Sequence, residues 1–341
     1  MQSELANFEK ELASYAGAKY ALGVGNATDG LIVACKAAGI GAGDEVILSS
    51  HTMIATAIGI QAAGGTPVPV ECGWDHLIDP EAVEHAITPR TKAILPTQLN
   101  GRTCNMDALQ EVADRHGLVV IEDAAQALGS KFKDRHAGAF GIASAISFYP
   151  SKVLGCLGDG GAILTSDDGM YERMWQLRDF GRDFQGRIVS WGINTRLDNL
   201  QAAFLSMRLR NYSPVIRRRR EIAQMYCDTL RGLPGLVLPP GPNSNRDHFD
   251  VYQNFEIEAP ERDSLKTFLA ECGIGTLIQW GGQAIHQLRC LGFKQDLPRM
   301  DHLFGRMLML PLNMSLTDED VEYVCSKVTE FHDKRVDPAA S

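Results

Sequence analysis

Short apolar runs alternate with amphipathic segments over the first half of the chain, from about residue 20 to residue 165. The apolar runs have the length and composition of buried strands, and they lie at 45–48, 67–70, 93–95, 118–121, 142–147 and 162–165. The segments between them have helical spacing at 29–38, 54–63 and 106–116, and glycines interrupt the pattern at 39, 41, 43, 64 and 65. Strands that alternate with helices predict an α/β fold with a large, mainly parallel sheet.

The second half of the chain has a different pattern. Residues 197–230 are mostly helical in spacing, with an interruption expected at Pro214 and a basic run at 217–220 that we interpret as a solvated helix face rather than a phosphate site. Prolines cluster between residues 234 and 242, and a strand is predicted at 251–257. Helices are predicted at 262–272 and 317–332, the second capped by Thr317 with Asp320. We therefore expect a large domain at 1–210 and a smaller C-terminal α+β domain at 211–341.

Composition and charge exclude several classes of protein. With 33 basic and 42 acidic residues, the net charge of -9 argues against general binding of nucleic acid. The eight cysteines contain no C-x-x-C pair, so neither a zinc site nor a disulfide framework is predicted, and reduced thiols favour a cytoplasmic location. No apolar run approaches the roughly 18 residues that a membrane-spanning helix needs, and we expect no membrane association.

One lysine and one aspartate stand out as candidate chemistry. Lys152 follows a strand and precedes a glycine-rich turn, and Asp123 ends the apolar run 118–121. Alone, such a lysine is usually a surface charge, and such an aspartate is as often a helix N-cap. Together, at strand ends of an α/β sheet, they suit pyridoxal phosphate (PLP), which needs a lysine for its Schiff base and a carboxylate for its ring nitrogen.

Five motifs extend this picture over nearly the whole chain. They are GNATDGL at 25–31, GDEVI at 43–47, EDAAQ at 122–126, SFYPSKVLGCLGDGG at 147–161, and NTRL at 194–197 followed by QAA at 201–203. In this order they resemble the DegT family of nucleotide-sugar aminotransferases. The resemblance implies a fold-type I PLP-dependent transferase, whose large domain binds the cofactor.

The resemblance also implies roles for individual residues. Lys152 would form the Schiff base and move protons, Asp123 would pair with the pyridine nitrogen, and Gln126 would contact the ring hydroxyl or the ring face. The cofactor phosphate would be bound by the residues at the start of a helix, by a strand serine and by an asparagine from the partner chain: Ala27, Thr28, Asp29, Ser147 and Asn194. The active site would then be shared within a homodimer.

The departures from the family pattern concentrate around the expected sugar pocket. Met53 stands where an aromatic residue often stacks on the ring, a contact that His51 could supply instead, and Ala27 replaces a frequent glycine. The segment 279–282, with Trp280, replaces a His-Tyr-Pro segment, and His286 follows it. Arg196 is a candidate for binding a carboxylate or phosphate, or for an ordinary ion pair. The expected substrate-binding set is therefore His51, Arg196, Trp280 and His286.

The activity that the resemblance implies is a ping-pong transamination. Glutamate would donate its amine, which would pass to a keto group of a nucleotide-linked sugar in amino-sugar biosynthesis for a polysaccharide or an antibiotic. A sugar dehydratase of the same family is one alternative, although it would carry histidine in place of Lys152. A regulatory protein that merely holds PLP is another. The amino terminus lacks the longer lead-in common in the family, so truncation or a changed start site is also an expectation.

Overall fold

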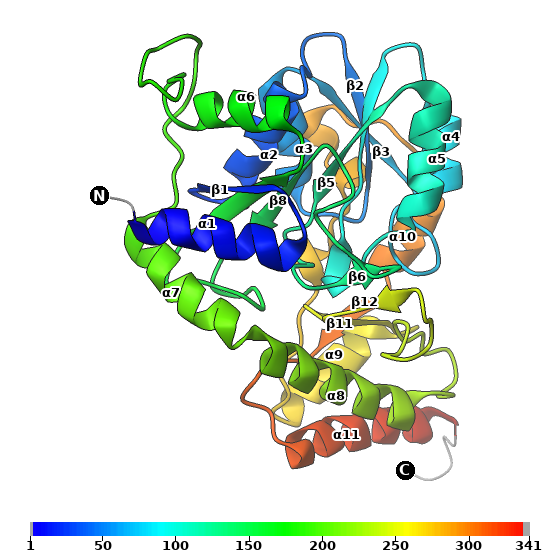
Figure 1. Cartoon of the computed structure of the whole chain (residues 1–341). Helices are drawn as coiled ribbons and strands as arrows, with labels where there is room; N and C mark the ends of the chain where they lie inside the picture. Colours follow the sequence, from blue (N-terminus) through cyan, green and yellow to red (C-terminus); the bar gives the residue numbers. More distant parts are fainter. Residues whose placement is uncertain (1–2, 337–341) are drawn as a thin grey trace.

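A large sheet forms the centre of the computed structural model, which describes residues 3–336 (Figure 1). Within that range its strand order is β1-β9-β8-β5-β4-β2-β3. The strands are β1 (Tyr20–Val24), β2 (Glu45–Ser49), β3 (Thr66–Val70), β4 (Thr91–Leu95), β5 (Val119–Asp123), β8 (Ala143–Ser147) and β9 (Gly161–Thr165). Pairing is parallel from β3 through β8, and β9 is antiparallel to both of its neighbours. The predicted mainly parallel sheet is confirmed.

Helices cover both faces of this sheet because its strands alternate their side chains. Val46 and Leu48 on β2 pack in the cluster that includes α2 (Ala27–Ala37) and α3 (Ile54–Ala63), whereas Ile47 packs on the opposite side. That opposite side is covered by α4 (Pro80–Ala86) and α5 (Met106–His116), and farther along by α1 (Ser3–Ala16) and α7 (Asn199–Arg210). Helix α6 (Asp168–Arg178) packs beside α2.

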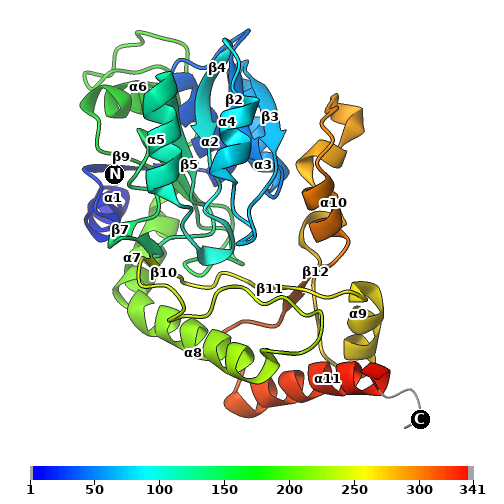
Figure 2. The same cartoon turned by 90° about the vertical axis from the view of Figure 1, so that its right-hand side faces the viewer.

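The C-terminal part forms a second, smaller core below the large sheet (Figures 1 and 2). Strands β11 (Phe255–Glu258) and β12 (Met307–Leu310) pair antiparallel. Their core is shared with α8 (Tyr212–Leu230), α9 (Arg262–Glu271) and α11 (Asp318–Val336). The remaining elements are β6 (Lys131–Phe132), β7 (Arg135–His136), β10 (His248–Phe249), η1 (Leu99–Gly101), η2 (Gln279–Gly282), η3 (Ile285–Gln287), η4 (Arg289–Leu291) and α10 (Pro298–Phe304).

Three details of the second half differ from the predictions or refine them. The interruption expected at Pro214 falls instead at Asn211, between α7 and α8; Pro214 lies in the first turn of α8, where its missing N–H is not needed. Strand β11 begins only at Phe255. Thr317 and Asp320 cap α11 as predicted: the Thr317 hydroxyl accepts from the Asp320 N–H at 3.2 Å. The domain border at 210/211 stays a prediction.

The basic run at 217–220 is only partly the solvated face that we predicted: Arg217 is exposed, but Arg219 is buried and Arg218 and Arg220 are half-buried. Arg219 is buried, and its guanidinium donates to the carbonyl oxygens of Tyr252, Gln253 and Leu312 at 2.8–3.1 Å. Arg220 donates to two further carbonyls, those of Asp250 and Pro242. These arginines bind α8 to the backbone of the segments that pack against it, a role that helical spacing alone does not reveal.

None of the helices within residues 3–336 combines the length and the apolar character that crossing a membrane requires.

Candidate active site

The candidate active site is a cavity of about 1120 Å³ at the carboxyl ends of the parallel strands. The large domain contributes the start of α2, the ends of β5 and β8, and the loop that carries Lys152. The C-terminal part contributes Gln253, Asn254, Gln279 and Trp280. In open α/β sheets this edge is where ligands bind, because loops rather than pleated backbone meet there.

Lys152 lies on the turn between β8 and β9, and its backbone is held on both sides. Its N–H donates to the Tyr149 carbonyl at 2.8 Å. The Gln253 side chain accepts from the Val153 N–H and donates to the Ser151 carbonyl, each at 2.9 Å. Burial lowers the pKa of Lys152 below its usual value, and Asp123 opposes that shift. A lowered pKa favours the neutral amine that proton transfer and imine chemistry require.

Asp123 ends β5 and faces the same cavity. Its carboxylate accepts from the Thr56 hydroxyl at 2.7 Å and from the Ala125 N–H at 3.1 Å. Burial raises the pKa of Asp123, and these two donors together with Lys152 only partly oppose the shift. A cationic N–H bound in the cavity would therefore favour the ionised form of this carboxylate.

The opposite end of the cavity is suited to an anion. Helix α2 starts there, and the side chain of its N-cap Asn26 accepts from the Asp29 N–H at 2.8 Å. Helix geometry leaves the N–H groups of Ala27 and Thr28 for a ligand, together with the positive end of the helix dipole. The Ser147 hydroxyl lines the same cavity. Asp29 lines it too, but its N–H is capped and its carboxylate accepts from the Thr195 hydroxyl at 2.6 Å.

These residues fit PLP. A phosphate suits the start of α2 and Ser147, a protonated ring nitrogen suits the buried Asp123, and an aldehyde suits the neutral amine of Lys152. Gln126 also lines the cavity, where it can contact the ring or its hydroxyl. The structure thus brings together eight of the predicted residues, namely Ala27, Thr28, Asp29, Asp123, Gln126, Ser147, Lys152 and Trp280.

The other four predicted residues do not line the cavity. His51 is buried beneath it, and its Nδ1 lies 3.1 Å from the His76 carbonyl. His286 has no exposed surface; its ring lies between Ser50 at 2.8 Å and Asp301 at 3.1 Å. Arg196 lies 3.2 Å from Asp179 in an exposed pair, and Asn194 is exposed next to it. In this single chain, both histidines therefore have structural contacts.

Several residues that line the cavity were not predicted. Gln253 and Asn254 come from a segment without a recognisable motif, and only the fold brings them to the cofactor side. Gln279 belongs to the segment 279–282, of which only Trp280 was predicted to bind substrate. Trp280 adopts a left-handed backbone conformation with φ of 50°, followed by two glycines that also have positive φ. Its ring lies edge-on to His51, with centroids 5.5 Å apart.

A cluster of buried ionisable groups supports this side of the cavity. His76 lies between two carboxylates, 3.1 Å from Glu256 and 3.0 Å from Glu258. Burial alone would lower the pKa of His76, but the two carboxylates outweigh it and raise the pKa to about 9. Burial likewise opposes ionisation of Glu256, yet His51 and His76 lower its pKa below the ordinary value. The cluster is therefore charged at neutral pH.

We expect His76 to make the stability of the fold depend on alkaline pH. Its pKa in the folded state, about 9, lies above its ordinary value of 6.5, so protonation stabilises the folded state. This contribution, about 3 kcal/mol, is complete below pH 6.5 and is lost as the pH rises through about 9. Denaturant unfolding at several pH values should show a steeper alkaline loss for wild type than for His76→Gln. If wild type and His76→Gln lost stability in parallel as the pH rises, this role of His76 would be contradicted.

The fold and the cavity together define a PLP-dependent transferase of fold type I. The family model of the DegT/DnrJ/EryC1/StrS aminotransferase family matches residues 1–329. The chain belongs to this family, and it is an aminotransferase that depends on PLP.

Individual relatives are similar over almost their whole length. The dTDP-3-amino-3,4,6-trideoxy-alpha-D-glucose transaminase of Streptomyces venezuelae is 41% identical, covering 98% of this chain and 89% of the relative. A protein of Geobacillus stearothermophilus named pleiotropic regulatory protein is 40% identical, covering 95% and 88%. Among solved structures, S. venezuelae DesV in complex with a ketimine intermediate has a TM-score of 0.93 at 40% identity, covering 97% of this chain and 90% of that one.

Proposed function

We propose that this aminotransferase moves an amino group from glutamate to a keto group of a nucleotide-linked sugar, and that it works as a homodimer in the cytoplasm. The observation that carries the proposal is the convergence of Lys152 and Asp123 on one cavity, in a chain that belongs to a family of sugar aminotransferases. The eight cysteines are free thiols, which is consistent with the reducing environment of the cytoplasm.

The residues of the cavity have separate roles in proton transfer and in cofactor binding. Bound PLP supplies an electron sink for the pair released when a proton leaves the substrate carbon. Lys152 takes and returns that proton as a neutral amine, and Gln253 holds its loop in place. Asp123 would hold a positive charge on the ring nitrogen, and the start of α2 and Ser147 would bind the phosphate.

The size of the cavity supports a large acceptor. About 1120 Å³ is more than PLP and an amino acid need, and it suits a sugar with an attached nucleotide. The similar enzyme from S. venezuelae is named for a dTDP-linked amino sugar. The two halves of the reaction balance: glutamate becomes 2-oxoglutarate, and the keto-sugar becomes an amino-sugar.

The proposed homodimer is supported by an exposed apolar loop. Between α6 and α7 the chain runs out from the large domain (Figure 1), and Trp191 in this loop is 95% exposed and Ile188 71% exposed. Phe180, Phe184 and Val189 are exposed as well. An apolar surface of this kind usually meets a partner. Asn194 follows in the same loop, which agrees with its predicted role at the phosphate of a second copy.

A hybrid dimer tests whether the site is shared. Lys152→Ala and Asn194→Ala chains, co-expressed with different tags and purified through both, should form dimers with one intact site. If Asn194 serves the partner's cofactor, such hybrids should recover about half of the wild-type activity, while each variant alone stays impaired. Hybrids with no more than about half the activity of the Asn194→Ala dimer would contradict the shared site.

The function itself is tested by following the nitrogen. Holoenzyme is incubated with nitrogen-labelled glutamate and a panel of dTDP- and UDP-linked sugars that carry a keto group at C3 or C4, and products are identified by mass spectrometry. We expect labelled amino-sugar and an equal amount of 2-oxoglutarate from at least one acceptor. Bound cofactor that responds to no amino acid would instead favour a regulatory protein, as the name of the G. stearothermophilus relative suggests. Lys152 disfavours the dehydratase alternative.

A further inference from the structure

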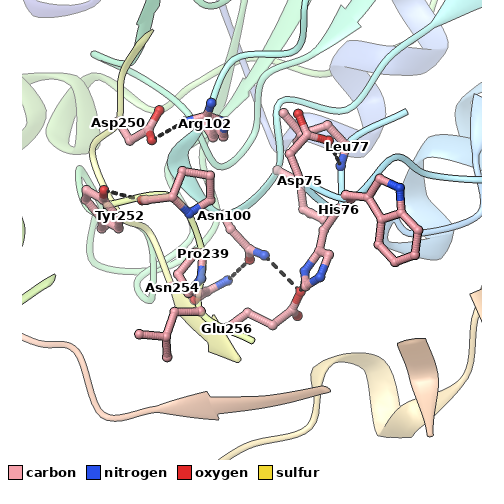
Figure 3. Close-up of a pocket in the computed structure, with 14 residues that line it drawn as sticks. Asp75, His76, Leu77, Asn100, Arg102, Pro239, Asp250, Tyr252, Asn254 and Glu256 are labelled. Carbon is pink, nitrogen blue, oxygen red and sulfur yellow. Dashed lines mark hydrogen bonds and ion pairs between the residues drawn. The ribbon is translucent and has the colours of Figure 1, made fainter. Parts of the chain in front are cut away.

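One buried carboxylate joins the small domain to the wall of the cavity. Glu256, on β11, is 1% exposed and points toward the large domain, where Asn100 and His76 approach it (Figure 3). Gln279 approaches it from η2 at 2.5 Å. Within residues 3–336, no group of three His, Cys, Asp or Glu side chains is placed to hold a metal ion.

An ionised carboxylate only accepts hydrogen bonds, so each neighbour of Glu256 must turn a donor toward it. His76 lies between Glu256 and Glu258 and therefore donates from both ring nitrogens. Asn100 must present its Nδ2, which lies 3.3 Å from Glu256 Oε1. Gln279 must present its Nε2 to Oε2. The charge of Glu256 thus removes the freedom of these amides to flip.

The orientation of the Asn100 amide in turn fixes the hydrogen bonds of two side chains nearer the cavity. Because Asn100 turns its Nδ2 to Glu256, its Oδ1 accepts from Asn254 Nδ2 at 2.8 Å and from Gln279 Nε2 at 2.9 Å. Both hydrogens on Gln279 Nε2 are then used, by Glu256 and by Asn100. The remaining polar atom of Gln279 is Oε1, whose partner among the described residues is Asn254 Nδ2 at a long 3.5 Å.

The amide of Asn254 is constrained in the same way, because its nitrogen is used by neighbouring acceptors. One hydrogen of its Nδ2 goes to Asn100 Oδ1 at 2.8 Å, and the other faces Gln126 Oε1 and Gln279 Oε1, each at 3.5 Å. Its Oδ1 is the atom left for other partners, and within residues 3–336 that oxygen has none. Asn254 and Gln279 both line the large cavity. With Nδ2 and Nε2 committed elsewhere, both residues offer this wall of the cavity acceptors rather than donors. Such a wall suits hydroxyl or amide N–H groups and does not suit phosphate oxygens.

We propose that Glu256 is a positioning residue that fixes Asn254 and Gln279 as hydrogen-bond acceptors, so that this wall recognises the hydroxyl-bearing sugar of the nucleotide-linked acceptor. The inference rests on the proposed function for the identity of the substrate. It assigns the sugar, rather than the nucleotide or its phosphates, to the side of the cavity formed by η2 and the segment before β11. Trp280, next to Gln279, adds an apolar surface there.

The test compares ligands with and without the sugar. Dissociation constants of dTDP-glucose, dTDP, UDP-glucose and UDP are measured by calorimetry with PLP-loaded wild type, Glu256→Gln and Glu258→Gln. Glutamine keeps the shape of Glu256 but can also donate, so Gln279 is free to flip. Glu258→Gln is the matched control, because Glu258 contacts the same His76 on the same strand but neither Asn100 nor Gln279.

In wild type we expect the sugar to tighten binding of at least one nucleotide by about tenfold or more. Glu256→Gln should lose most of that gain while binding the nucleoside diphosphate as wild type does, and Glu258→Gln should keep it. An unchanged gain in Glu256→Gln, or an equal loss in both variants, would overturn this inference and leave the proposed function standing. Wild type that binds none of the four ligands would overturn both.

Discussion

Replacing Lys152 by alanine should lower turnover by at least about 10³-fold, because the chain loses the group that holds the cofactor and moves the proton. The fold should survive: Lys152 is a buried amine whose pKa is lowered by burial, so its removal relieves desolvation rather than breaking a stabilising pair. Steady-state turnover with glutamate and the accepted keto-sugar, together with denaturant unfolding, measures both effects.

Two further lysine variants define the cause of the loss. Lys152→Arg keeps a positive charge but cannot become a neutral amine, so it should be as inactive as Lys152→Ala. Lys133→Ala changes an exposed lysine outside the cavity, and its turnover should stay near that of wild type. Turnover of Lys152→Ala within about tenfold of wild type would remove Lys152 from the proton transfers.

The Asp123→Asn variant should lose about 10²- to 10³-fold in turnover, because an amide cannot hold the ring nitrogen in its protonated form. Its apoprotein should be no less stable than wild type. Burial raises the pKa of Asp123, and its carboxylate has only two donors, the Ala125 N–H and the Thr56 hydroxyl, which can rotate, so an amide oxygen can replace the carboxylate without facing a second fixed donor. Turnover of the loaded enzyme and unfolding of the apoprotein together test this pattern of lost activity with retained stability.

The adjacent carboxylate provides the opposite pattern as a control. Glu122 points to the other side of β5 and accepts from the N–H groups of Gly138, Phe140 and Gly141 at 2.7–2.8 Å. Burial raises the pKa of Glu122 as well, but fixed N–H donors from the backbone and from Gln98 face both of its oxygens. The amide of Glu122→Gln therefore turns a donor toward donors and should cost about 2 to 3 kcal/mol of stability. The folded variant should keep most of its turnover. Equal losses of activity in Asp123→Asn and Glu122→Gln would contradict the role given to Asp123.

The large sheet could be predicted because its determinants are local. Each predicted apolar run is bounded by glycines or polar residues, and helical segments separate the runs, so the positions of the strands other than β1 and the mainly parallel pairing followed from spacing. Lys152, Asp123 and the start of α2 were found together because parallel strands deliver their carboxyl ends to one edge. The structure brings these same residues to one cavity.

The wall of the cavity that the C-terminal part forms could not be predicted, because it depends on tertiary contacts rather than on local patterns. Gln253 contacts the Lys152 loop from about 100 positions away in the chain, and Glu256 meets His76 and Asn100 only through the packing of the two domains. His51 and His286 seemed suited to a substrate, but their ring nitrogens face buried partners. Arg219 belongs to a run of charges that is typical of solvent, yet buried carbonyls bind it. Sequence spacing carries no information about such tertiary partners.

The most direct measurement of the central claim is the absorption spectrum of PLP-loaded enzyme through one cycle. Glutamate alone should abolish the visible band of the lysine-bound cofactor, and the accepted keto-sugar nucleotide should restore it with release of the amino-sugar. Lys152→Ala should show neither change on the same timescale. A visible band that glutamate and every other amino acid leave unchanged in wild type would contradict the claim that this cavity performs amine transfer.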